Sequence, residues 1–168
     1  MLLEVLVFRS LFRNTKTEKQ GEALGVGSAK WLWLGALVFH WSMLIIVLRH
    51  LRFFLEPVPG AIMALEGADA FFQIGLPALY LTDLLIVSAL TFLFVRRVVI
   101  PRVRYLSLPN DFFPLFLLLG VVIAGIAMRY FFRVDIEGVK EVAMGLVTLH
   151  PVVVAGIGPI FYVYLFLA

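Results

Sequence analysis

Four long apolar runs dominate this sequence and constrain its fold more than any other feature. They extend from about Trp31 to Leu51, Phe71 to Val95, Phe112 to Phe132 and Val142 to the last residue, Ala168. A helix of about 20 apolar residues crosses the roughly 30 Å hydrocarbon core of a lipid bilayer. The sequence therefore predicts an all-α integral membrane protein, built as a four-helix bundle with short loops.

Composition supports the same class of protein. Of the 168 residues, 62% are apolar and 15% are charged, whereas soluble domains have roughly 45–50% and about 25%. The chain has no cysteine, which excludes disulfides, thiolate chemistry and cysteine-ligated metal sites within it. The net charge of +3 comes from basic residues at the predicted helix ends. We therefore expect a lipid bilayer and no nucleic acid among its partners.

The chain divides near residue 30. Residues 1–29 are predicted to form an N-terminal juxtamembrane or cytoplasmic segment, and residues 30–168 the four-helix domain. The apolar stretch Met1–Phe12 is too short to span a membrane, so it either lies along the surface or is the tail of a missing element. Prolines such as Pro59 and Pro109 mark short loops between the runs. The fourth run is still apolar where the sequence stops, which predicts a truncated or unusually short protein.

Basic residues predict the orientation, because cytoplasmic loops are enriched in Lys and Arg. One side of the predicted bundle has Arg9, Arg13, Lys16, Lys19, Lys30, Arg96, Arg97, Arg102 and Arg104, and the other has Arg49, Arg52, Arg129, Arg133 and Lys140. The first side has more basic residues, so it is predicted to face the cytoplasm. Both termini lie on this side, which predicts a multi-pass protein with both termini in the cytoplasm.

The three histidines, His40, His50 and His150, all lie on predicted spans. His40 and His50 are roughly 15 Å apart along one helix and roughly 80° apart around it, so both can face the bundle interior. If the first and fourth spans are antiparallel, His50 and His150 lie at similar depth. Two imidazoles facing each other across a bundle can bind a six-coordinate haem b. A simple hydrogen bond from each histidine to a neighbouring helix is the alternative.

Charged residues near these histidines suggest further roles. Arg49 and Arg52 flank His50, and Arg129 is predicted to end the third span at the same level, where guanidinium groups could pair with haem propionates. Asp83 is predicted near the middle of the second span, as a carboxyl group hydrogen-bonded to Thr82, to Ser88 or to a tryptophan across the bundle. The alternative interpretation of Asp83 is a proton relay or quinone contact.

Four segments carry a resemblance to a known family. They are HWSMLIIVLRHLRFFLEPVP (His40–Pro59), FFQIGLPALYLTD (Phe71–Asp83), RRVVIPRVRYLSLPNDFFPLFLLLG (Arg96–Gly120) and GVKEVAMGLVTLHPVV (Gly138–Val153). Together they resemble the cytochrome b subunits of sulfite-reduction-associated (Dsr) membrane complexes, within the nitrate reductase gamma-subunit-like family.

The resemblance implies a quinone-reactive anchor with two haem b groups in the cytoplasmic membrane of a prokaryote. Such a subunit exchanges electrons between menaquinone or another quinone and a cytoplasmic iron–sulfur subunit that resembles heterodisulfide reductase. Other membrane and periplasmic subunits complete the complex, so the chain is an electron-transfer subunit rather than an enzyme alone. The alternative is a truncated or degenerate anchor for that partner, without complete transmembrane electron transfer.

The resemblance also implies the haem ligands. His50 and His150 match the ligands of the outer haem, and His40 matches one ligand of the inner haem. Tyr164 stands where the family has the fourth histidine. Fourteen residues of helix from His150 span roughly 21 Å, which predicts Tyr164 near the level of His40. One haem is therefore expected, and the inner one is absent, five-coordinate on His40 or ligated by tyrosine.

Overall fold

The computed structural model describes residues 4, 6–12, 26–70 and 78–168, and the regular structure in these residues is helical. The main helices are α3 (Val26–His50), α4 (Gly60–Asp69), α5 (Leu81–Val99), α6 (Pro101–Leu106), α7 (Pro109–Ala127), α8 (Ile136–Val147) and α9 (Pro159–Leu167). A short 3₁₀ turn, η2 (Leu51–Phe53), continues α3, and a π-helical turn, η3 (Met128–Phe132), continues α7. The all-α prediction is confirmed for this part of the chain.

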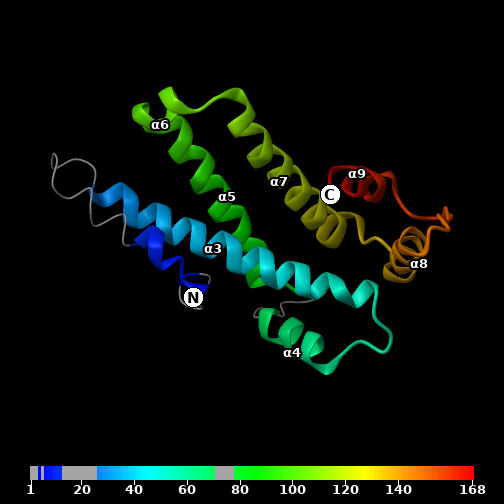
Figure 1. Cartoon of the computed structure of the whole chain (residues 1–168). Coiled ribbons are helices and arrows are strands. Elements are labelled where there is room, and N and C mark those ends of the chain that lie inside the picture. Colours follow the sequence, from blue (N-terminus) through cyan, green and yellow to red (C-terminus); the bar gives the residue numbers. More distant parts are fainter. Residues whose placement is uncertain (1–3, 5, 13–25, 71–77) are drawn as a thin grey trace.

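The long helices α3, α5 and α7 form the body of the molecule (Figure 1). Helix α5 packs against both α3 and α7, and α6 connects α5 to α7 at one end. At the other end α4 packs against α3, and α9 packs against α7. This second end is the one predicted to face outward, and it holds His50 and the cluster of charged residues described below.

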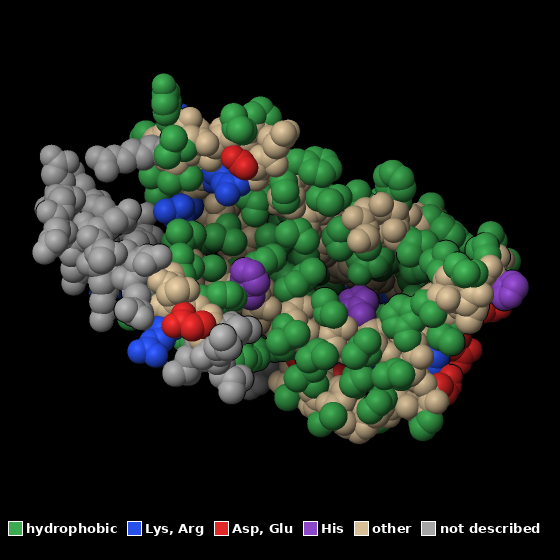
Figure 2. Space-filling view, viewed as in Figure 1, with side chains coloured by type: hydrophobic (Ala, Val, Ile, Leu, Met, Phe, Trp, Pro, Cys, Tyr) green, Lys and Arg blue, Asp and Glu red, His purple; other side chains and the backbone are tan. Residues whose placement is uncertain are grey.

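Two of the described helices are long and apolar enough to cross a membrane, namely Lys30–Phe53 and Pro109–Phe132. They correspond to the first and third predicted runs. Helix α5 overlaps the second run, but it begins at Leu81 and continues to Val99, and residues 71–77 lie outside the described residues. Hydrophobic side chains cover most of the face shown in Figure 2, as expected for helices that contact lipid.

The fourth run is not one continuous helix, and this prediction was wrong. Helix α8 ends at Val147, residues 148–158 are not helical, and α9 begins at Pro159. Leu149 has a left-handed backbone with φ of 59°, and Pro151 disfavours a helical conformation at the residue before it. Pro159 suits the first turn of a new helix because its missing N–H would have no partner there. His150 and Tyr164 therefore do not share a helix.

The described part of the N-terminal segment lies against α3. The indole of Trp33 donates to the carbonyl of Val7 at 2.7 Å, and that of Trp41 donates to the carbonyl of Leu6 at 2.9 Å. These bonds attach the segment to α3 through backbone carbonyl groups, which would otherwise lack partners in an apolar environment.

The best-buried apolar side chains are on α5. Ile86 and Leu90 are almost completely enclosed, and Ala89 is also buried. Helix α3 approaches α5 closely at Gly35, where an added Cβ would lie 2.7 Å from the ring of Phe92. A small residue at this crossing is what lets two helices approach closely in a membrane.

Candidate functional site

A buried ion pair joins α3, α4 and α5 at the predicted outer end of the bundle. Arg49, next to His50 in the sequence, donates from Nη1 to Oδ2 of Asp69 at 2.5 Å. The same carboxylate accepts from the Thr82 backbone N–H at 2.9 Å and from the Thr82 hydroxyl at 2.5 Å. All three side chains are buried. Three donors on one carboxylate offset much of the loss of hydration that burial causes.

Tyr80 lies between two guanidinium groups in the same region. The Cζ atom of Arg49 is 3.7 Å from the ring centroid, and that of Arg129 is 4.4 Å away. The phenol donates to Oε1 of Glu66 at 3.0 Å, and Arg52 donates to the same oxygen at 2.5 Å. The Glu66 carboxylate can only accept, so the Tyr80 hydroxyl is the donor in this bond.

Asp83 lies in the first turn of α5 rather than in mid-span, and its predicted partners were wrong. Its Oδ2 accepts from Nη1 of Arg129 at 2.9 Å and from the hydroxyl of Tyr130 at 3.0 Å. Thr82 bonds to Asp69 instead, and the Ser88 hydroxyl bonds to a backbone carbonyl on its own helix. Asp83 therefore links α5 to the end of α7.

The arginines predicted to pair with haem propionates have carboxylate partners within this chain. Arg49 pairs with Asp69, Arg52 with Glu66 and Arg129 with Asp83. Sequence reasoning missed Glu66 and Asp69 because the stretch that forms α4 was expected to be part of a short loop, and it also missed the role of Tyr80 at the start of α5. The signal that could have found two of them is the pair of carboxylates in the otherwise apolar stretch Gly60–Asp69.

His50 is half-buried at the end of α3 and is fixed on both sides of its ring. Its Nδ1 lies 2.7 Å from the carbonyl oxygen of Ile46, and its Nε2 lies 3.2 Å from the hydroxyl of Tyr164. The Phe53 ring contacts the imidazole edge-on at 5.7 Å between centroids. Helix α9 approaches α7 closely here, since a Cβ on Gly125 would lie 3.5 Å from the Tyr164 ring.

His40 has the same ring orientation ten residues earlier on α3. Its Nδ1 lies 2.7 Å from the carbonyl oxygen of Ala36, and the side chain is exposed. The rings of Phe8 and Phe39 contact it at 4.8 Å and 5.0 Å. In Figure 2 the histidines appear as separate purple patches.

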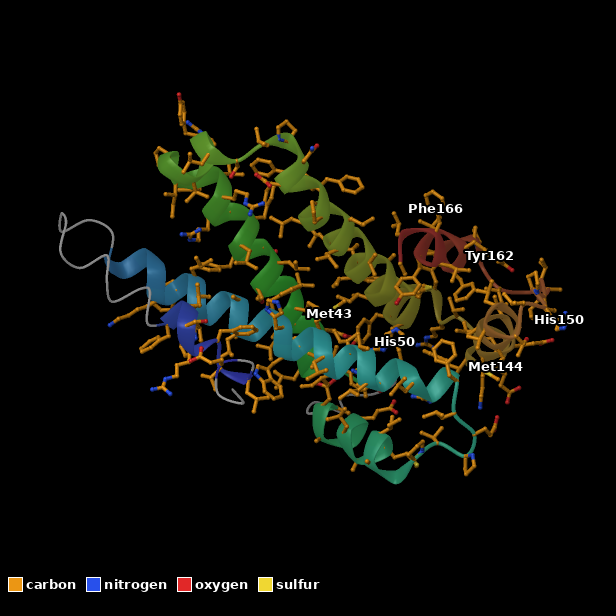
Figure 3. All side chains as sticks on the ribbon, in the orientation of Figure 1. Met43, His50, Met144, His150, Tyr162 and Phe166 are labelled. Atoms are coloured by element: carbon orange, nitrogen blue, oxygen red, sulfur yellow. The ribbon has the colours of Figure 1, made fainter. Side chains whose placement is uncertain are left out.

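His150 lies in the non-helical segment after α8 and is exposed. Figure 3 shows it at the outer edge of the molecule, whereas His50 lies beside the long helices. The structure thus brings His50 together with Tyr164, and does not bring His50 together with His150. It also does not place Tyr164 near the level of His40, because the helix that carries Tyr164 begins only at Pro159.

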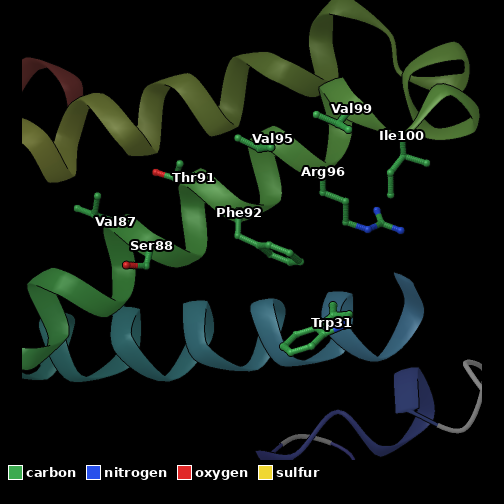
Figure 4. Close-up of a pocket in the computed structure, with 9 residues that line it drawn as sticks. All are labelled: Trp31, Val87, Ser88, Thr91, Phe92, Val95, Arg96, Val99 and Ile100. Atoms are coloured by element: carbon green, nitrogen blue, oxygen red, sulfur yellow. The ribbon is translucent and has the colours of Figure 1, made fainter. Parts of the chain in front are cut away.

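Two cavities flank this arrangement. One, of about 520 Å³, lies at the His50 end between η2 and α8. It is lined by the charged residues Arg52, Glu56, Glu137, Lys140 and Glu141 and the apolar residues Phe53, Val58, Ile136 and Met144. The other, an apolar groove of about 630 Å³, lies between α3 and α5 towards the opposite end (Figure 4). It is lined by Trp31, Val87, Ser88, Thr91, Phe92, Val95, Arg96, Val99 and Ile100. Both volumes fall in the range of small-molecule sites.

The histidines on α3 fit axial ligation of a haem. No three His, Cys, Asp or Glu side chains among the described residues form a metal site, but a haem takes only one or two axial donors from the protein. In both His40 and His50, Nδ1 is tied to a backbone carbonyl one turn earlier. A metal-binding imidazole is oriented in the same way, with its other nitrogen turned towards the metal.

Comparison with known proteins identifies the family. The family model described as the nitrate reductase gamma subunit matches residues 1–167. The chain belongs to this family. It is 45% identical, over its whole length, to a protein of Archaeoglobus fulgidus named Hdr-like menaquinol oxidoreductase cytochrome b-like subunit.

A protein of Archaeoglobus profundus with the same name is 39% identical over 90% of the chain. The alignments cover 51% and 45% of these two relatives, so the chain spans about half the length of the curated relatives it matches. No solved structure matches the chain.

Proposed function

We propose that this chain is the haem b-binding part of a membrane subunit that carries electrons between menaquinol and a cytoplasmic iron–sulfur partner. Membership of the nitrate reductase gamma-subunit family and the names of the two relatives support a quinone-linked cytochrome role. The observation that carries the proposal is the orientation of His50, which is half-buried with Nδ1 bonded to Ile46 and Nε2 directed across to α9.

His50 and His40 on α3 would hold haem, and the one expected haem would bind at His50. His150 and Tyr164 are the two candidates for a second protein ligand to that haem. When bound, the haem supplies one-electron chemistry, which quinol oxidation needs in two successive steps. At this end of the bundle, carboxylate partners neutralise the positive charges of Arg49, Arg52 and Arg129.

Menaquinol is proposed to approach through the 520 Å³ cavity at the His50 end. Phe53 lines that cavity and contacts the His50 ring, so a bound quinol would lie close to the proposed haem ligand. Met144→Trp, which fills this cavity, should slow haem reduction by a menaquinol analogue by about tenfold or more. Val87→Trp in the groove at the opposite end is the matched control and should leave the rate unchanged.

The test of the haem itself is the amount of haem b per polypeptide in the detergent-solubilised chain, measured as the pyridine haemochromogen. We expect about one haem per chain, lost in His50→Ala. His150→Ala should lower the haem content only if His150 is the second ligand. The haem content of His40→Ala tests whether an inner haem is bound. A colourless wild-type protein after haem supplementation would rule out the proposal.

A second candidate is a membrane anchor that holds the partner without complete transmembrane transfer. The separation of His150 from His50 favours it, because the expected bis-histidine pair is not assembled in the structure. If bound haem cannot be reduced by a menaquinol analogue while the partner still co-purifies, the anchor function is supported.

The resemblance also supports finer proposals. They are membership of a sulfite-reduction-associated complex, a partner that resembles heterodisulfide reductase, and a location in a prokaryotic cytoplasmic membrane with both termini inside.

A further inference from the structure

We infer that the Tyr164 hydroxyl is a gate on His50, which must open before a metal centre can bind there. The inference rests on the proposed haem-binding function, but its first test needs no haem. It is carried by three observations: the bond of His50 to Ile46, the bond between His50 and Tyr164, and the position of the Tyr164 ring, which an added Cβ on Gly125 of α7 would meet at 3.5 Å.

The two hydrogen bonds of His50 define its protonation pattern. The carbonyl oxygen of Ile46 can only accept, so Nδ1 carries the ring proton and donates it. In a neutral imidazole Nε2 then has a lone pair and no hydrogen. The Tyr164 hydroxyl, 3.2 Å away, is therefore the donor and Nε2 the acceptor.

The same lone pair is the one that would bind iron. It can accept a hydrogen bond from Tyr164 or form a bond to a metal, but not both. An iron between the two atoms would need about 2 Å on each side, or about 4 Å in all, by analogy with other imidazole and oxygen ligands. The observed separation of 3.2 Å leaves no such space, so the hydroxyl must leave before His50 binds haem.

The phenol ring has a structural role that is separable from its hydroxyl. It packs where α7 has a glycine, since a Cβ on Gly125 would already lie 3.5 Å from the ring. Tyr164→Phe keeps this packing and removes only the hydroxyl. Tyr162→Phe is the matched control, because it removes a buried hydroxyl two residues away that has no hydrogen-bond partner among the described residues.

The first experiment is nitrogen NMR of ¹⁵N-histidine-labelled chain in detergent, without haem. We expect Nδ1 of His50 to be protonated and the resonance of Nε2 to shift in Tyr164→Phe but not in Tyr162→Phe. An unchanged Nε2 resonance in Tyr164→Phe would overturn the gate whether or not the protein binds haem. Failure of the wild type to bind haem would instead overturn the proposed function. The gate and the proposed function can therefore fail independently.

The second experiment is a haem titration of the same variants. Removing the gate should tighten haem binding about fivefold, the equivalent of one hydrogen bond of about 1 kcal/mol. The absorption spectrum should keep the shape of the wild type. Weaker binding with a changed spectrum would identify Tyr164 as an iron ligand, and an unchanged affinity would mean that the hydrogen bond imposes no barrier. Either result would refute the gate.

Discussion

The two ends of the contact between α3 and α5 are held by different forces. Towards the predicted cytoplasmic side, Gly35 meets the ring of Phe92, and shape alone determines how closely the helices approach. At the His50 end, Arg49 reaches Thr82 on α5 and Asp69 on α4, and charge determines the arrangement. One pair of helices therefore combines a close apolar crossing with a polar attachment.

The difference shows what packing in a lipid-facing protein requires. Lipid tails are as apolar as leucine, so burying apolar side chains between helices gives little driving force there. Close packing supplies only dispersion contacts, whereas a buried charge must be paired or it destabilises the fold strongly. The charged end should consequently be far more sensitive to substitution than the apolar crossing.

Asp69→Asn should have the largest effect, because it leaves the buried Arg49 guanidinium without a carboxylate. We expect a loss of about 3–5 kcal/mol in the free energy of unfolding, measured by denaturation in mixed detergent micelles. The double variant Arg49→Met, Asp69→Leu should recover most of that loss, because it removes both charges together. If the single variant unfolds like the wild type, the charged end is not the more sensitive one.

Gly35→Ala tests the apolar crossing directly. The added methyl group would lie 2.7 Å from the Phe92 ring, so we expect a loss of about 1–3 kcal/mol from overpacking. Gly67→Ala, where an added Cβ meets nothing within 4 Å, should instead stabilise α4 by about 0.5–1 kcal/mol. Adding Phe92→Leu to Gly35→Ala should restore stability if the clash with the ring is the cause.

Thr82→Val separates hydrogen bonding from charge at the His50 end. The substitution keeps the shape of the side chain but removes its bond to Asp69 and the longer bond that it accepts from Arg49, and we expect a loss of about 1 kcal/mol. Thr91→Val, at an exposed position on the same helix, is the control and should change stability little. Equal effects of the two substitutions would show that the hydroxyl of Thr82 contributes nothing specific.

Lys140→Gln should have the smallest effect. Its ion pair with Glu56 joins α8 to the loop before α4, but the Glu56 side chain is 79% exposed. Water and salt screen such a pair, so we expect a change of at most about 0.5 kcal/mol. A loss comparable to that of Asp69→Asn would contradict the distinction between buried and exposed pairs.

The apolar runs predicted two of the helices well because hydropathy accumulates over about 20 residues and needs no knowledge of neighbours. The break between α8 and α9 was missed, although Pro151 and Pro159 mark it, because the run remains apolar throughout. Helix α4 was missed because a short apolar helix next to prolines looks like a loop in the sequence. Local backbone chemistry, rather than composition, determines both features.

The structure joins the candidate residues in other pairs than the sequence predicted. His40 and His50 could be selected from the sequence because they share one helix with a fixed spacing. The contact of His50 with Tyr164 could not, since it depends on the residue at which α9 begins. The same holds for Arg49, whose partner Asp69 lies on a helix that was not predicted.

The ion pair between Arg49 and Asp69 also bears on how the protein enters its membrane. The two residues are 20 positions apart, so at 5–20 residues per second the arginine is synthesised about 1–4 s before the carboxylate. During that interval the end of α3 has a cation without its partner, which favours keeping it at the aqueous boundary. Insertion of α3 is therefore expected to finish only when α4 has emerged, so that the two helices enter as one biosynthetic unit.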